Sequence, residues 1–136
     1  GVQVYRKRAK RVISEVSDPM WIRNKKDGKI SYEINQDSRL ITSFVDDLDD
    51  DQFDKFAMLI KSLENCFPTI PLFHDLANNP SDLEQPSISD DELMRVFDLF
   101  KSDMVSHELN IESLLRIEPF ASNKNQAKKL ISDLGI

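Results

Sequence analysis

The sequence predicts a mainly α-helical domain with one small β-hairpin, an α+β fold of six or seven helices. Two patterns and the composition support this prediction. Apolar residues recur every three or four positions along most of the chain, as on the buried side of helices. Residues 20–35 instead alternate on both sides of an Asp27-Gly28 pair, which is typical of a hairpin. The length of 136 residues and the hydrophobic content of 40% suit one domain with one core.

The first predicted helix spans residues 2–16. Its apolar residues gather near one face, while its basic residues lie away from that face. Asp18-Pro19 is expected to end this helix, because the residue before a proline resists helical backbone geometry.

The predicted hairpin, residues 20–35, follows directly. The apolar residues of its second strand share one face, and an apolar residue of the first strand joins them. An isolated hairpin is only marginally stable in water, so this face is expected to pack on helices or on strands outside this chain. It either covers the helical core or forms a docking edge for a partner. The interaction residues predicted from this pattern are Trp21, Ile22, Ile30, Tyr32 and Ile34.

Further helices are expected in the remainder of the chain. Their ranges are 38–48, 49–67, 71–78, 89–105, 110–118 and 122–135. Asp37 or Ser38 is the expected cap of the first of these, and Asp50 or Asp51 that of the second. Phe44 and Val105 are placed on buried faces by their helical spacing.

A capping box and a glycine mark two of the later helix ends. Ser89 precedes Glu92 by three residues, which predicts a capping box at the start of the 89–105 helix. Gly135 is the expected stop of the last helix.

The charge is divided unevenly along the chain. Residues 1–29 hold nine Lys/Arg and three Asp/Glu, a net charge of +6, whereas residues 30–136 hold nine and 21, a net charge of −12. The basic part either lies against the acidic body or meets an external partner such as nucleic acid. The candidate nucleic-acid contacts are Arg6, Lys7, Arg8, Lys10, Arg11, Arg23, Lys25, Lys26 and Lys29.

No motif of catalysis or of metal binding is found in the sequence. Its three glycines form no phosphate-binding loop. The acidic run from Asp47 departs from a calcium-binding loop at Gln52 and Met58, so we interpret it as a helix cap. Cys66 is interpreted as a buried structural residue and His74 as a partly exposed one. We therefore expect no catalytic residue, no metal, no cofactor and no small-molecule ligand.

The sequence also bears on the compartment. A single cysteine excludes an internal disulfide, and no stretch approaches the about 20 apolar residues of a membrane span. No apolar core follows the basic residues at the start, so a signal peptide is not predicted. These features predict a cytoplasmic protein without membrane contact. The first residue is Gly1 rather than methionine, which indicates a piece of a longer protein.

A resemblance lies in the order of short motifs. Trp21, Gly28 and Tyr32 are followed by "IN", by Leu40-Ile41 and, near the end, by "EPF". This order resembles the C-terminal region of bacterial proteins that carry an Hsp90-like (GHKL-type) ATP-binding module at the N-terminus. Some of those proteins are encoded beside restriction–modification genes. Ser38-Arg39 stands where that family has His-Pro.

This resemblance covers most of the chain but includes no catalytic motif. The family's ATP site lies in the other module, so no ATP-binding residue carries over. The resemblance implies that the chain is the helical tail of a nucleotide-driven protein, with a role in DNA defence.

Together these inferences define a single helical domain over residues 1–136. Residues 1–35 hold a basic helix and the hairpin, and residues 36–136 form an acidic helical body. The favoured function is non-catalytic protein interaction or oligomerisation, with another domain of the same protein or a second copy as partner. The first alternative is nucleic-acid contact through the basic residues. The second is an enzyme whose site is assembled only in three dimensions, around Cys66 and His74.

Overall fold

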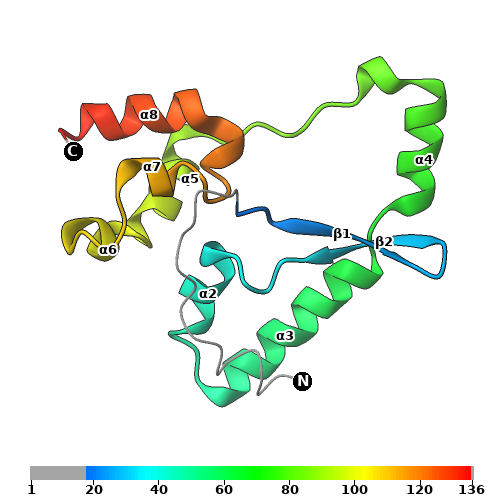
Figure 1. Cartoon of the computed structure of the whole chain (residues 1–136), viewed down its shortest axis with the longest axis horizontal. Coiled ribbons are helices and arrows are strands. Elements are labelled where there is room, and N and C mark those ends of the chain that lie inside the picture. Colours follow the sequence, from blue (N-terminus) through cyan, green and yellow to red (C-terminus); the bar gives the residue numbers. More distant parts are fainter. Residues whose placement is uncertain (1–17, 136) are drawn as a thin grey trace.

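The computed structural model describes residues 18–135, and the predicted helix over 2–16 lies outside them, with the candidate contacts at residues 6–11. The described residues form a mainly helical fold with one antiparallel hairpin, which confirms the predicted fold class (Figure 1). The strands are β1 (Trp21–Lys26) and β2 (Lys29–Ile34). The helices are α2 (Arg39–Val45), α3 (Asp50–Asn65), α4 (Thr69–Asn78), α5 (Asp90–Asp98), α6 (Lys101–Val105), α7 (Ile111–Leu114) and α8 (Lys124–Asp133). Two short 3-10 helices are η1 (Pro80–Asp82) and η2 (Ala121–Asn123).

The hairpin turns at Asp27-Gly28, as the sequence predicts. Both residues have positive φ angles, 53° and 76°, as a two-residue type I′ turn requires. The register places Trp21 opposite Ile34 and Ile22 opposite Glu33. Since directly opposed residues share a face, Trp21 belongs to the apolar face of β2 and Ile22 to the opposite face.

Polar side chains cap the helices after the hairpin. The Ser38 hydroxyl accepts a hydrogen bond from the Ile41 N–H at the start of α2. Asp49 and Gln52 form a reciprocal capping box at the start of α3. The expected caps Asp50 and Asp51 were therefore wrong, because both lie inside the helix while Asp49 keeps an extended backbone.

The predicted helix over 89–105 is divided into α5 and α6. Helix α5 begins where expected, and the Ser89 hydroxyl accepts a hydrogen bond from the Glu92 N–H. The chain leaves α5 after Asp98, and the Phe100 side chain is fully buried. This break changes the phase of the apolar positions, so Val105 is 76% exposed instead of buried. Phe44 on α2 is exposed as well, contrary to the prediction.

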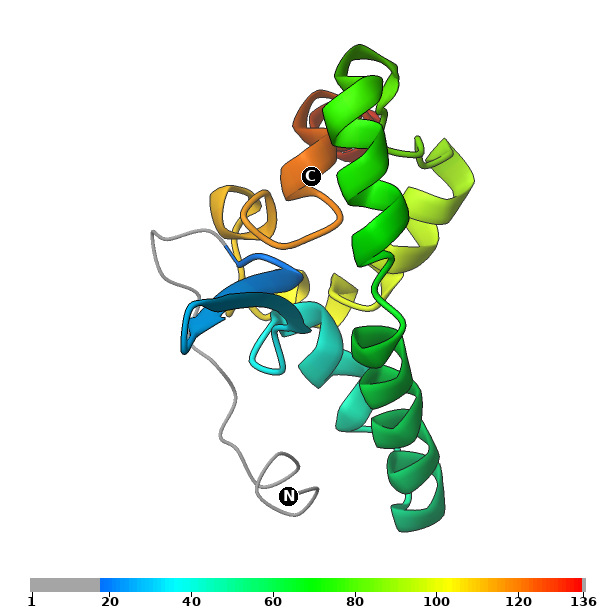
Figure 2. The ribbon, with the colours of Figure 1, turned by 90° about the vertical axis from the view of Figure 1, so that its right-hand side faces the viewer.

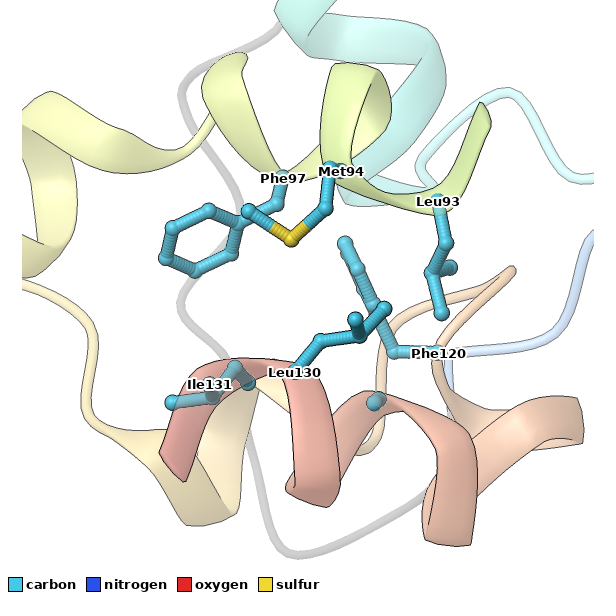
Figure 3. Close-up of a pocket in the computed structure, with 7 residues that line it drawn as sticks. Leu93, Met94, Phe97, Phe120, Leu130 and Ile131 are labelled. Atoms are coloured by element: carbon cyan, nitrogen blue, oxygen red, sulfur yellow. The ribbon is translucent and has the colours of Figure 1, made fainter. Parts of the chain in front are cut away.

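The buried side chains of the described residues form two apolar clusters. One joins α5, α7 and α8 with the segments that flank them, and the other joins the end of β2 to α2 and α3. In Figure 3, Leu93, Met94 and Phe97 of α5 face Leu130 and Ile131 of α8. This seam leaves no space for a water molecule, so it is packed core rather than a ligand site. The second cluster consists of Ile34, Ile41, Val45, Phe53 and Ile60.

Polar contacts connect the residue Asp18, which precedes the hairpin, with α2 and the segment after α7, and they connect α2 with α6. The Arg39 N–H donates to a carboxylate oxygen of Asp18 at 2.7 Å. The Arg39 guanidinium pairs with the Asp103 carboxylate at 2.7 Å, and both side chains are largely shielded from water. The Asp18 N–H donates to the Arg116 carbonyl at 3.0 Å. These contacts hold α2, α6 and the segment after α7 in one arrangement.

Candidate protein-docking surface

Helix α4 projects its apolar side chains into solvent. None of its ten residues is buried, and Ile70 and Phe73 are 81% and 73% exposed. In Figure 1 the helix stands at the edge of the molecule, beside the hairpin and apart from α5–α8. Figure 2 shows that it follows the end of α3, with the hairpin beside their junction. A monomer rarely leaves such an apolar helix uncovered, so this face has the character of an interaction site.

A groove of about 310 Å³ lies between α4 and the hairpin. Three consecutive residues of β2 contribute to it, which means that the groove follows the outer edge of the strand rather than one face of the sheet. Residues at the end of α3 close its floor. The lining residues are Ile30, Ser31, Tyr32, Glu64, Asn65, Phe67, Thr69, Leu72, Phe73 and Leu76. We call this groove and the exposed face of α4 the docking surface.

Phe67 joins the hairpin to the end of α3. Its ring stacks on Tyr32, with centroids 4.9 Å apart, and meets Trp21 edge-on at 5.3 Å. The Glu64 carboxylate accepts a hydrogen bond from the Ile34 N–H at 2.8 Å. These contacts fix the position of β2 relative to α3, so the hairpin side of the groove is preformed.

The five predicted hairpin residues are not brought together into one patch. Ile34 is only 6% exposed and belongs to the core cluster of α2 and α3. Trp21 and Tyr32 are exposed but pack on Phe67, and Ile30 is 50% exposed at the groove. Ile22 is exposed on the opposite face of the hairpin. Of the five, Ile30 and Tyr32 line the groove.

Sequence reasoning missed the contribution of α4. The sequence predicts only the helix ranges 49–67 and 71–78, which contain Phe67, Leu72, Phe73 and Leu76, and it assigns no interaction to these four residues. A signal was present, because the predicted helix over 71–78 is short and apolar and has a proline near each end. Such a helix needs a partner, but the sequence does not show whether the chain itself supplies one.

The basic hairpin residues are all exposed but divided between two faces. Arg23 lies opposite Tyr32 and Lys25 opposite Ile30, so these two share the face of the groove residues. Lys26 and Lys29 oppose each other beside the turn, on the other face. The hairpin therefore adds positive charge next to the groove and also at its tip.

The two residues considered for catalysis, Cys66 and His74, are both exposed. Cys66 is exposed, so its interpretation as a buried structural residue was wrong. It follows the last turn of α3, where the amphipathic pattern of that helix no longer faces the core. His74 is exposed on α4, and its ring Nδ1 lies 3.3 Å from the side-chain nitrogen of Asn78. Residues 18–135 hold no group of three or more His, Cys, Asp or Glu side chains placed to bind a metal ion.

Two further findings bear on what the protein does. Among residues 18–135, none of the helices has the length and apolar content needed to cross a membrane. No protein-family pattern, curated protein or solved structure matches this chain. The docking surface itself is therefore the observation from which function is argued.

Proposed function

We propose that this chain is a non-catalytic protein-docking module, and that it binds its partner through the docking surface formed by the hairpin and α4. The partner is another domain of the same protein or a second copy. The observation that carries this proposal is the exposure of α4, none of whose residues is buried.

Burial of this surface would stabilise a complex substantially. Ile70, Phe73 and Leu76 keep between half and four fifths of their surface in water. Removing each from water contributes about 1 kcal/mol or more, since a fully buried side chain of this size contributes about 1.5–3 kcal/mol. Aromatic anchors are also the usual centres of binding energy in protein interfaces. Tyr32, Phe67 and Phe73 meet that description.

The resemblance to Hsp90-like ATPases suggests the setting of this module. In that reading the chain is a helical tail, and the nucleotide-driven module of the same protein is its partner. The docking surface would then transmit or report the state of that module. Nothing in this role requires a catalytic residue in the tail.

Amide hydrogen exchange tests the proposal without knowledge of the partner. Exchange would be measured for the native assembly isolated from the cells that make the protein, and for the purified chain alone. We expect exchange in Thr69–Asn78 to slow by at least about tenfold in the assembly, because docking removes local opening of an otherwise unsupported helix. Lys101–Val105, a short and exposed helix elsewhere, is the internal control. Equal exchange of α4 in both samples would contradict the proposal.

A second candidate function is contact with nucleic acid through the hairpin tip. It is supported by the four exposed basic residues of the hairpin: Arg23, Lys25, Lys26 and Lys29. Phosphate contacts of this kind release counterions, so the affinity would fall steeply between about 50 and 200 mM salt. A titration with DNA and RNA oligonucleotides over that range, using wild type and Lys26→Glu, separates this function from apolar docking.

A further inference from the structure

Two apolar side chains of α4 project into solvent next to each other. Ile70 is 81% exposed and Phe73 is 73% exposed. Residues three positions apart are neighbours on a helix surface, so these two side chains form one apolar projection. Phe73 also lines the groove, whereas Ile70 stands outside it.

The groove beside α4 has the size to receive such a projection. Its volume is about 310 Å³, which is at the lower end of the range for pockets that hold a small molecule. A helix with its side chains is about 10 Å wide, so the groove accepts projecting side chains rather than a whole helix. Its walls are largely apolar, with Ile30 and Tyr32 on one side and Leu72 and Leu76 on the other. One surface therefore presents both an apolar projection and an apolar cavity.

The charges around this surface are balanced. Among residues 18–135, Glu64 is the only charged residue that lines the groove, and its carboxylate already accepts a hydrogen bond from the Ile34 N–H. The one acidic residue of α4, Asp75, is half-buried. Arg23 and Lys25 lie on the hairpin face that carries the groove residues. Two acidic and two basic residues thus offset each other, although the chain has a net charge of −6.

This balance matters for the choice of partner. In a symmetric contact between two copies, the same surface patch meets itself. A patch with net charge would repel its own copy, whereas a neutral apolar patch does not. The docking surface is therefore suited to self-association.

The exposed apolar area is sufficient for a dimer. Five apolar side chains of the docking surface are between 38% and 81% exposed: Ile30, Tyr32, Ile70, Phe73 and Leu76. An aromatic side chain presents about 150–250 Å² and an aliphatic one somewhat less, so these five leave roughly 500 Å² of apolar area in water. A standard interface buries about 800 Å² from each partner, of which about 56–65% is apolar. The exposed apolar area therefore matches the apolar share of one side of such an interface.

We propose that the docking surface binds a second copy of this chain around a two-fold axis. Ile70 of each copy inserts into the groove of the other, where it meets Tyr32 and Phe73. The contact uses the same residues on both sides, so it closes as a dimer. This inference rests on the proposed docking function and names the partner, which that function leaves open between another domain and a second copy.

The mass of the intact chain in solution tests this proposal. Light scattering over rising concentration should show a dimer that persists at about 50 and about 500 mM salt, because the contact is mainly apolar. Ile70→Asp places a charge in that contact and should weaken the dimer at least about tenfold. Val105→Asp is the matched control, because Val105 is 76% exposed on α6, outside the docking surface. Circular dichroism would confirm that both variants are folded.

Isotope-filtered NMR locates the contact. A sample that mixes labelled and unlabelled chains reports contacts between copies and not those within one copy. We expect signals between the Ile70 methyl groups of one copy and the ring protons of Tyr32 or Phe73 of the other.

Three results would overturn the two-fold contact: the intact chain stays a monomer up to about 1 mM, Ile70→Asp dimerises like Val105→Asp, or no signal joins Ile70 to the groove of the other copy. The docking function is judged separately, by protection of α4 in the native assembly. Because a dimer would protect α4 in the purified chain as well, exchange of that chain is measured below the dissociation constant of the dimer. If the chain is a monomer while α4 is protected in the native assembly, the surface docks another partner. If α4 is not protected there, the docking function fails as well.

Discussion

The ring of Tyr32 stacks on the ring of Phe67, with their centroids 4.9 Å apart and their planes inclined by 17°. Tyr32 is in the middle of β2, and Phe67 lies just beyond the end of α3. This pair therefore anchors a hairpin that has only two strands and would be marginally stable alone. It also fixes the floor of the groove, since α4 begins two residues after Phe67.

The first prediction concerns this anchor. Phe67→Ala removes the stacked contact with Tyr32 and the edge contact with Trp21, so we expect the free energy of unfolding to fall by about 2 kcal/mol. Phe44→Ala is the matched control. Because Phe44 is exposed on α2, its substitution should lower the free energy of unfolding by less than about 1 kcal/mol. Urea unfolding measures both. Equal losses in the two variants would mean that Phe67 does not anchor the hairpin.

The second prediction concerns the ion pair between Arg39 and Asp103. Both side chains are mostly shielded, so Asp103→Ala leaves a poorly solvated guanidinium, and we expect a loss of about 2 kcal/mol in the free energy of unfolding. Asp98→Ala breaks the exposed Asp98–Lys101 pair, which lies in solvent, and should change stability by less than about 1 kcal/mol. Denaturant titration of both variants checks the difference. Similar small losses of stability in both variants would show that the ion pair between Arg39 and Asp103 does not hold α2 and α6 together.

The third prediction concerns the turn of the hairpin. Gly28 has a φ angle of 76° and open space around its Cα, so Gly28→Ala meets no steric obstacle beyond its own backbone conformation. We expect a loss of about 1 kcal/mol from that conformation alone. Asp27→Gly relaxes the neighbouring φ angle of 53° and should stay within about 0.5 kcal/mol of wild type. NMR of the amides of β1 and β2, together with denaturant unfolding, provides the measurement. No loss in Gly28→Ala would argue against this turn geometry.

The fourth prediction concerns the start of α3. Asp49→Ala removes the side chain that accepts from the Gln52 N–H, so we expect a loss of about 1 kcal/mol in the free energy of unfolding. Asp51→Ala removes only a favourable interaction with the helix dipole and should cost about 0.5 kcal/mol or less. Thermal unfolding of the pair gives the comparison. If Asp51→Ala were the more damaging variant, the capping residue would have been misassigned.

Local features of the fold could be predicted from the sequence. The Asp27-Gly28 turn fixes the hairpin, and Ser38, Ser89 and Gly135 mark helix ends where the structure has them. Turn pairs and helix caps depend on contacts among three or four neighbouring residues, so they can be recognised from the sequence alone. The register of the hairpin also follows from the turn, which resolves whether Trp21 or Ile22 joins the apolar face.

The position of the docking surface could not be predicted in the same way. Whether Ile34 is buried depends on α2 and α3 packing over the end of β2, which is a tertiary contact. Val105 and Cys66 were misjudged because helical periodicity reports which side of a helix is apolar, but not where the helix ends relative to the core. The groove exists only because Phe67 brings the hairpin to the start of α4.

Photo-cross-linking at Phe73 tests the central claim most directly. A photoreactive amino acid would replace Phe73 in the intact protein, in the cells that make it, and the same amino acid would replace Val105 on α6 as a control of similar exposure. The account predicts covalent adducts of defined mass from position 73 and few or none from position 105. Adducts of equal amount at both positions, or none at position 73, would contradict a docking surface at α4.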